Sequence, residues 1–259
     1  MIPGFLTADL GPGARGGFTA RAGGVSTGPY GGPGGTGGLN LGPHVGDDDE
    51  AVRANRARLE QALGSPVAWM SQVHGAAVEV IDGPDGATRA RECDALVAPA
   101  GSGVALGVLV ADCVPVLIAD PIGVVGVAHV GRSGLVAGVL ESALAAMADL
   151  GAEPGRMRAV VGPSICGRCY EVPAEMQADV AARVPGTASA TSWGTAALDL
   201  PAGVRARLVA LGVDGVHDTG VCTLEDERYY SYRRSGRSGG GPVTGRFAGV
   251  VRPAGRHAD

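Results

Sequence analysis

Three residues that can bind metal ions lie at the edges of apolar segments typical of buried strands. They are His74 in "SQVHG", Cys113 in "VADCVP" and His129 in "GVAHVG". Rigid scaffolds often present reactive groups where strands pass into loops. Two imidazoles and a thiolate suit a catalytic zinc ion, which keeps three protein ligands and leaves the fourth position to water or substrate. Single histidines and cysteines at strand ends are also common in ordinary cores, so both interpretations stay open.

A carboxylate directly precedes this cysteine. Asp112 lies between two apolar runs in "LVADCVPVLIAD", where a charge is unfavourable unless a partner pairs with it. Beside a zinc ion, Asp112 would orient a ligand or act as a general base. Without a metal, Cys113 would be a nucleophile, with His129 or His74 as its base and Asp112 as the orienting acid. That second arrangement is typical of an amide hydrolase.

The remaining cysteines carry a weaker signal. The chain has five cysteines and no export signal at its start, which favours reduced thiols over disulfides. Cys166 and Cys169 form a C-x-x-C, which occurs in zinc knuckles and redox pairs. The chain holds no second C-x-x-C and no thioredoxin-like context, so we interpret these two as incidental thiols.

Two arginines near the C-terminus lie in segments rich in turn residues. Arg233 belongs to "YSYRR" and Arg246 to "TGR". Guanidinium forks bind phosphate or carboxylate in a bidentate manner. The same residues are equally consistent with an arginine-bearing surface.

Composition excludes several classes of function. All 21 basic residues are arginine, so no mechanism that needs a Schiff-base lysine is available. The net charge of -5 argues against non-specific nucleic-acid binding. No apolar run approaches the length of a membrane span. No signal peptide opens the chain, so we expect a cytoplasmic protein with no membrane or nucleic-acid partner.

Helices and strands are interleaved along the chain without strict alternation. We predict a surface loop over residues 23–46 and a flexible insertion over 237–242. Periodicity and capping residues predict helices over 47–64, 135–150, 173–184 and 199–212. β-Branched runs predict strands over 68–75, 76–82, 93–99, 104–111, 114–120, 124–130, 157–164, 213–220 and 245–253. We therefore expect one α+β domain over residues 1–259, with mixed β-sheets flanked by helices.

Blocks along nearly the whole chain resemble the YfiH family, also called the multicopper polyphenol oxidase (laccase) domain or peptidoglycan-editing-factor family. The resemblance rests on "RAGGVSTGPY", "LNLGPHVGDDDEAVRANRARL", "SQVHG", "CDALV", "ADCVPVLIAD", "GVAHVG", "VVGPSICGRCYEV", "GVCTLED" and "YSYRRSG" with "TGRFAGVV", in that order. It implies an α+β fold similar to that of cysteine-hydrolase toxins. It also implies zinc held by His74, Cys113 and His129.

The resemblance further implies a zinc-dependent purine nucleoside phosphorylase. Its substrates would be phosphate and adenosine, inosine or methylthioadenosine, and some members also deaminate adenosine. Arg132, Arg233 and Arg246 would hold phosphate, and Asn40 and Arg21 would line the pocket. The peptidoglycan-editing label fits the cysteine-dependent amide hydrolase instead. Copper is less suitable than zinc, since a multicopper oxidase needs about ten histidines and this chain has five, with no His-x-His pair.

One segment departs from the family pattern. Family members often read "AHAGWRG" where this chain reads "AHVGRSG", so that Arg132 takes the Trp position and Ser133 takes the Arg position. Neighbouring strand residues face opposite ways, so Arg132 replaces the family arginine only if the segment has left the strand. Otherwise the chain would be a nucleoside-binding protein without turnover. The sequence leaves the preferred nucleoside and the oligomeric state open.

Overall fold

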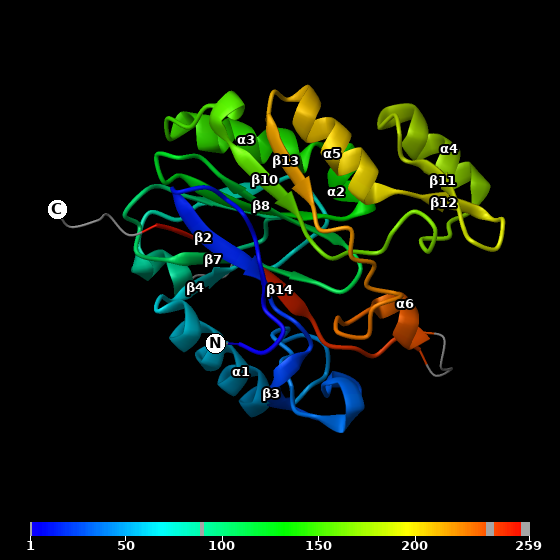
Figure 1. Ribbon diagram of the computed structural model, residues 1–259, viewed down its shortest axis with the longest axis horizontal. Coiled ribbons are helices and arrows are strands. Elements are labelled where there is room, and N and C mark those ends of the chain that lie inside the picture. The colour runs from blue at the N-terminus through cyan, green and yellow to red at the C-terminus, as the bar shows by residue number, and fades with distance from the viewer. Residues whose placement is uncertain (1, 89–90, 237–240, 255–259) are drawn as a thin grey trace.

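Two mixed β-sheets pack face to face, with helices on the outer side of each (Figure 1). The computed structural model describes residues 2–88, 91–236 and 241–254. The five-stranded sheet has the order β1 (Leu6–Thr7), β2 (Ala14–Phe18), β14 (Phe247–Pro253), β7 (Ala105–Val110) and β4 (Val67–Trp69). The six-stranded sheet has the order β13 (Gly215–Asp218), β10 (Arg158–Val161), β8 (Val114–Ala119), β9 (Val125–Val130), β6 (Ala95–Ala98) and β5 (Val78–Val80).

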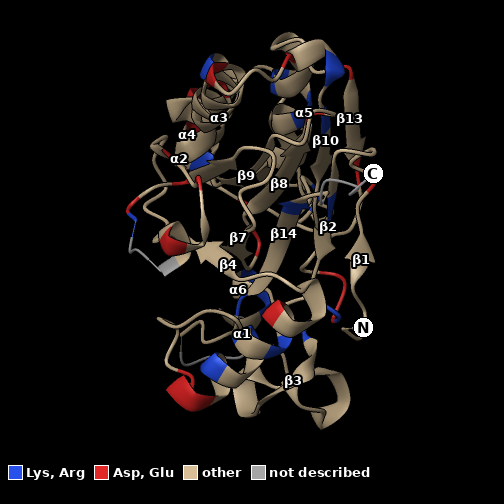
Figure 2. Cartoon of the chain, turned by 90° about the vertical axis from the view of Figure 1, so that its left-hand side faces the viewer, with Lys and Arg blue, Asp and Glu red and all other residues tan. Residues whose placement is uncertain are grey.

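Helices cover these sheets unequally. The six-stranded sheet packs against helices from the middle of the chain, and the five-stranded sheet packs against one helix from its first quarter (Figure 2). The helices are α1 (Asp49–Leu63), α2 (Arg132–Ala137), α3 (Val139–Asp149), α4 (Ala174–Arg183), α5 (Leu200–Ala210) and α6 (Tyr232–Ser235). Smaller elements are β3 (Ala22–Ser26), the pair β11 (Ala188–Ala190) and β12 (Ala196–Leu198), and 3-10 turns at Gly28–Tyr30, Pro33–Gly35, Pro84–Thr88 and Pro154–Arg156. The fold is therefore the α+β arrangement with mixed sheets that the sequence predicts.

The central strands are apolar on both faces because each sheet has a core on either side. In β14, Phe247 and Val251 face the core between the sheets, whereas Ala248 and Val250 face the cluster that includes Leu59 of α1. Such strands read as continuous apolar runs rather than alternating ones. This explains why the apolar runs in the sequence predict the strands β8 and β9 clearly.

Strand β9 carries one polar side chain into this arrangement. Val125 and Val127 belong to the core between the sheets. His129 follows with the same two-residue period and therefore points to the same side. It pairs with Pro115 near the beginning of β8. The histidine thus reaches one end of the space between the two sheets.

The predicted helix over 47–64 is confirmed as α1, including both of its ends. The Asp48 side chain accepts a hydrogen bond of 2.9 Å from the Ala51 N–H and caps the first turn. Gly64 ends the helix in the left-handed conformation with φ of 66°. Predictions for the helices over 173–184 and 199–212 agree with α4 and α5 to within two residues at each end.

Three predictions need correction. The helix over 135–150 is two helices, because Gly138 adopts φ of 88° between α2 and α3. The region 23–46 is not purely a surface loop, since it contains β3 and buries Leu39 and Leu41. The strand over 68–75 ends at Trp69, and a turn carries the chain onward.

Of the predicted insertion over 237–242, residues 237–240 lie outside the described residues. Among the parts of the chain that the structure does describe, no helix combines the length and the apolar character needed to cross a bilayer.

Candidate metal and nucleoside site

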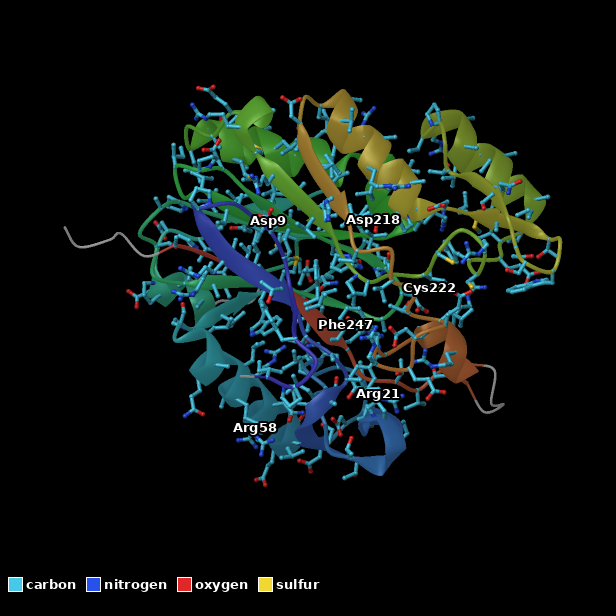
Figure 3. All side chains as sticks on the ribbon, in the orientation of Figure 1. Asp9, Arg21, Arg58, Asp218, Cys222 and Phe247 are labelled. Atoms are coloured by element: carbon cyan, nitrogen blue, oxygen red, sulfur yellow. The ribbon has the colours of Figure 1, made fainter. Side chains whose placement is uncertain are left out.

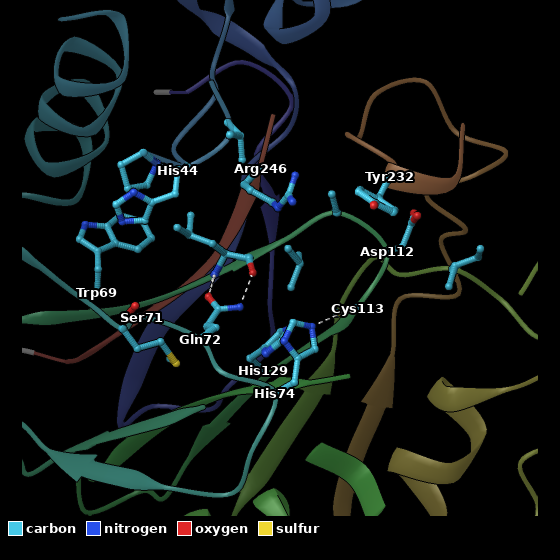
Figure 4. Close-up of a pocket in the computed structure, with 18 of the residues that line it drawn as sticks. His44, Trp69, Ser71, Gln72, His74, Asp112, Cys113, His129, Tyr232 and Arg246 are labelled. Carbon is cyan, nitrogen blue, oxygen red and sulfur yellow. Dashed lines mark hydrogen bonds between the residues drawn. The ribbon is translucent and has the colours of Figure 1, made fainter. Parts of the chain in front are cut away.

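A cavity of about 870 Å³ opens at the end of the sandwich where the metal-ligand residues lie (Figure 4). This volume falls in the usual range for small-molecule sites. Its wall includes His74, Cys113 and His129. The carboxylate and guanidinium groups on its wall, within the described parts of the chain, belong to Asp112 and five arginines: Arg56, Arg91, Arg132, Arg233 and Arg246. The excess of guanidinium groups favours an anionic ligand.

The three metal-ligand side chains come from three different elements. His129 is on β9, Cys113 is in the turn that joins β7 to β8, and His74 is in the turn after β4. One ligand atom from each lies within 4.8 Å of the others. Cys113 Sγ is 4.0 Å from His74 Nε2. The two imidazole rings meet edge to face at a centroid distance of 4.7 Å. The structure therefore brings together all three predicted ligands.

Asp94 holds both histidines in place. Its carboxylate is fully buried and lies 2.7 Å from Nδ1 of His129. The same carboxylate accepts hydrogen bonds from the backbone N–H groups of His74 at 3.0 Å and Gly75 at 2.7 Å. In ligand histidines, the N–H of the second ring nitrogen commonly donates a hydrogen bond to a carboxylate in this way, which fixes the tautomer and the ring orientation. Nε2 of His129 is thereby left for Cys113 or a metal ion.

Unusual backbone conformations occur at two of these positions. His74 has φ of 60° and Asp112 has φ of 95°, and no other non-glycine residue in the described parts of the chain has positive φ. Such conformations persist only where the surroundings fix them. Around His74, Gln72 supplies part of this support, because its side-chain amide exchanges hydrogen bonds with both backbone groups of Leu109 on β7.

The electrostatics of the site favour the thiolate form of Cys113. Burial raises the pKa of this thiol, but hydrogen bonds with His129 and His74 outweigh burial and lower the pKa to about 6. Burial lowers the pKa of His129, but its hydrogen bonds with Asp94 and Cys113 raise that pKa to about 9. A thiolate is the form that both metal binding and nucleophilic attack require.

The arrangement of these residues suits a zinc site better than a catalytic site in which Cys113 is the nucleophile. In a tetrahedral site with Zn–S near 2.3 Å and Zn–N near 2.0 Å, ligand sulfur and nitrogen are about 3.5 Å apart. The separation of 4.0 Å between Cys113 and His74 is close to that value. A thiol nucleophile needs one base, whereas here two imidazoles converge on one sulfur. If a triad did operate, its third member would be Asp94, not the predicted Asp112.

Asp112 instead anchors neighbouring loops. Its Oδ1 accepts a hydrogen bond of 2.6 Å from the Thr223 hydroxyl, and its Oδ2 accepts one of 2.7 Å from the Arg233 N–H. Its backbone carbonyl accepts a third bond from Ile165 at 3.0 Å. Figure 4 shows this carboxylate on the side of Tyr232. Both oxygens are engaged, so the geometry suits an orienting role better than that of a general base.

The three arginines expected to bind phosphate all line the cavity. Arg132 is the first residue of α2, so the segment has left the strand by this point, and Ser133 is exposed and does not line the cavity. Arg233 lies 5.1 Å over the ring of Tyr170, and Arg246 donates to the carbonyl of Thr244 at 3.0 Å.

Two expected pocket residues lie elsewhere. Arg21 stacks on Tyr230 and lines a separate hollow of about 400 Å³. Asn40 is fully buried behind the cavity wall, where its side-chain oxygen accepts a bond of 2.8 Å from the Arg246 N–H. Asn40 therefore supports an arginine of the cavity without lining it.

Other residues of the candidate site were missed from the sequence. Trp69 and Tyr170 give the cavity aromatic surfaces, and Arg56 lies 4.6 Å over the Trp69 ring. Asp94 carried the same signal that identified Asp112, namely a carboxylate directly before a buried strand in "CDALVA". Nothing local distinguishes Trp69 or Tyr170 from core aromatics.

Comparisons with known proteins give matches that span most of the chain. A family model described as multi-copper polyphenol oxidoreductase laccase matches residues 15–253. A purine nucleoside phosphorylase of Streptomyces griseus is 52% identical over 255 residues, which cover 97% of this chain and 99% of that protein. A purine nucleoside phosphorylase of Pseudomonas aeruginosa is 40% identical, with 90% of each chain covered.

Solved structures give the same relationship. A Neisseria meningitidis protein superposes with a TM-score of 0.84 at 37% identity, covering 97% of this chain and 99% of the other. The Bacillus licheniformis protein YfiH superposes with a TM-score of 0.77 at 26% identity, covering 95% and 98%. Since these matches span almost the whole chain, this protein belongs to the YfiH family, the family of the multi-copper polyphenol oxidoreductase laccase model.

Proposed function

We propose that this chain is a zinc-dependent purine nucleoside phosphorylase. The observation that carries the proposal is the opening of the His74, Cys113 and His129 cluster into a cavity lined by five arginines. The names of relatives up to 52% identical support the same activity. The substrates would be phosphate and a purine nucleoside such as adenosine, inosine or methylthioadenosine.

In the proposed reaction, a phosphate oxygen forms a bond to C1′ of the ribose as the bond from C1′ to the purine nitrogen breaks. The electron pair of that bond leaves with the purine, which takes up a proton, and the products are the free base and ribose 1-phosphate. A zinc ion on the three ligands would supply Lewis-acid stabilisation of negative charge next to the reacting atoms.

The chain's own residues would do the rest. Arg132, Arg233 and Arg246 would bind phosphate and shield its charge so that it can approach the sugar. The rings of Trp69 and Tyr170 offer flat apolar surfaces for the purine. Asp112 would keep Arg233 at the cavity through its hydrogen bond to that residue's backbone. These assignments account for the excess of cations over acids on the wall.

The test is product analysis with and without phosphate. Adenosine and inosine are incubated with the purified protein, and free base, ribose 1-phosphate and free ribose are separated by chromatography. We expect base and ribose 1-phosphate in equal amounts, no turnover without phosphate, and loss of activity on chelation that zinc restores. Equal turnover without phosphate would contradict the proposal, as would full activity in Cys113→Ala. Conversion of adenosine to inosine in the same samples would add the deaminase activity.

A cysteine-dependent amide hydrolase would respond differently to chelation. Its activity would survive chelation and would be lost on alkylation of Cys113. A nucleoside-binding protein without turnover would bind adenosine and release no base. For such a protein, Ser133→Arg would restore turnover. Because Arg132 already lies on the cavity wall, we expect Ser133→Arg to give no gain in turnover.

A further inference from the structure

A second group of metal-ligand side chains lies outside the cavity. Cys166, Cys169, Cys222 and Glu225 each place one sulfur or carboxylate oxygen within 4.8 Å of the others. Cys169 and Cys222 are buried, Cys166 is half-buried, and Glu225 is exposed at the edge. We predicted that the C-x-x-C consists of incidental thiols, but the fold brings a third cysteine and a carboxylate to it. Figure 3 shows Cys222 on the side of the molecule that carries α6 and the β11–β12 pair.

Two loops form this group, and backbone hydrogen bonds hold them in register. Ser164 donates to the Val221 carbonyl at 3.1 Å, and Thr223 donates back to Ser164 at 3.0 Å. Within the first loop, the N–H groups of Cys169 and Tyr170 donate to the Cys166 carbonyl at 2.9 and 3.0 Å. This tight turn brings both sulfurs of the C-x-x-C to the side that faces Cys222.

The sulfurs lie in surroundings that suit thiolates bound to a cation. The Cys166 N–H points at Cys222 Sγ at 3.5 Å, and Cys169 Sγ is 3.4 Å from Glu225 Oε1. A thiol that coordinates a cation loses its proton, so these sulfurs would bind the ion as thiolates.

We propose that Cys166, Cys169, Cys222 and Glu225 bind a structural zinc ion. Three thiolates and one carboxylate fill a tetrahedral shell, and such closed sites are typical of structural rather than catalytic zinc. Soft sulfur ligands exclude magnesium and calcium. Binding one Zn²⁺ releases the three thiol protons, so the occupied site would carry two negative charges. Arg168, whose guanidinium lies 3.9 Å from Glu225, partly balances them.

A disulfide between two of these cysteines explains the site less well. It would leave the third thiol and Glu225 without a role, although the carboxylate is directed at the Cys169 sulfur. The apolar side chains of Ile165 and Leu224 pack around the cluster and keep water from its inner side.

The proposed ion would stabilise the cavity from behind. Ile165 and Thr223, one from each loop, both donate hydrogen bonds to Asp112, and Tyr170 of the first loop lines the cavity. An ion that joins the two loops would therefore keep Asp112 and Tyr170 in position. Because the proposed ion has a structural role, it would bind whether or not the protein is a phosphorylase.

The test separates the two sites by mutation and counts zinc per chain by mass spectrometry. Cys113→Ala removes a ligand of the cavity site, and we expect about one tightly bound zinc to remain after incubation with zinc and dialysis. Adding Cys222→Ser to this variant should remove that zinc. Cys93→Ala is the matched control, because Cys93 is a buried cysteine that belongs to neither cluster. It should leave the zinc content unchanged.

Two further measurements test the site if Cys222→Ser does not fold. Cobalt added to metal-free Cys113→Ala protein should give the near-ultraviolet band of cobalt–thiolate charge transfer. Alkylation of the wild-type protein followed by peptide mapping should show Cys166, Cys169 and Cys222 protected by zinc. Absence of zinc from Cys113→Ala, a cobalt spectrum without that band, or a mass lower by two hydrogens from a disulfide would each overturn the proposal.

Discussion

The carboxylate of Asp94 lies 2.7 Å from Nδ1 of His129 and leaves the opposite ring nitrogen, Nε2, facing Cys113. The same buried carboxylate accepts a hydrogen bond from the backbone N–H of His74. One side chain thus fixes the ring of one expected ligand and the backbone of the other. The cluster is preorganised by a residue that does not itself belong to it.

Asp94→Asn tests this relationship. An amide keeps the shape of the side chain but presents N–H donors to backbone N–H donors of the turn around His74. We expect zinc affinity at the cavity site to fall about 10- to 100-fold, measured by competition with a chromophoric chelator. Asp120→Asn is the control, because Asp120 is equally buried and accepts bonds from Ile122 and Glu153 far from the ligands. An unchanged affinity in Asp94→Asn would show that Asp94 does not orient the histidines.

Gly131→Ala tests the space around the cluster. A Cβ atom at Gly131 would lie 2.9 Å from Cδ2 of His74 and 3.5 Å from Sγ of Cys113, so the imidazole must shift. Gly131 has φ of -82°, which alanine adopts without strain. We expect a loss of zinc affinity of at least about tenfold, with little change in the unfolding midpoint of the metal-free protein. Gly83→Ala, where a Cβ would meet nothing within 4 Å, should change neither quantity.

The ionisation of Cys113 gives a pH-dependent prediction for the metal-free protein. Its pKa of about 6 lies below the usual thiol value, so the reactive thiolate is present above pH 6 and disappears as the pH falls below it. The alkylation rate by iodoacetamide, followed by peptide mapping, should therefore rise with a midpoint near pH 6. Burial raises the pKa of Cys93 to about 11, so that thiol should stay unmodified and serve as an internal control. A midpoint near pH 9 for Cys113 would contradict the described contacts.

Arg132→Ala tests the phosphate role. Loss of one charge-assisted contact should raise the KM for phosphate about tenfold or more while the zinc content stays constant. Ser133→Ala changes the adjacent residue of the same helix, which is exposed and does not line the cavity, and should have no effect. If KM for phosphate is unchanged in Arg132→Ala while KM for the nucleoside rises, the guanidinium contacts the nucleoside instead.

Local patterns predicted nine of the described strands, because buried runs such as β8 and β9 carry a strong signal. They missed the short or glycine-rich strands β1, β2, β3, β11 and β12. They also identified His74, Cys113 and His129, since each lies where an apolar run gives way to Gly or Pro. They missed Asp94, whose importance depends on contacts with the distant segments that carry His74 and His129. They also missed the break at Gly138, since an amphipathic pattern continues on either side of it.

The same limit applies to long-range clusters. The spacing of Cys166 and Cys169 indicates a possible site. Cys222 and Glu225 lie close to them only because two loops pair in the folded chain. Asn40 shows the reverse case, in which a conspicuous polar residue supports the site from behind its wall. Spacing along the chain predicts which residues can react, whereas tertiary pairing decides which of them meet.

The turn that carries Asp112 and Cys113 is also the point where the chain passes from one sheet to the other, from β7 to β8. His129 belongs to the six-stranded sheet, and His74 follows a strand of the five-stranded sheet. An ion shared by these ligands would act as a cross-link between the two halves of the sandwich. Separation of the two sheets and loss of the ion would then occur together. Each tenfold rise in free zinc above the dissociation constant would therefore raise the free energy of unfolding by about 1.4 kcal/mol.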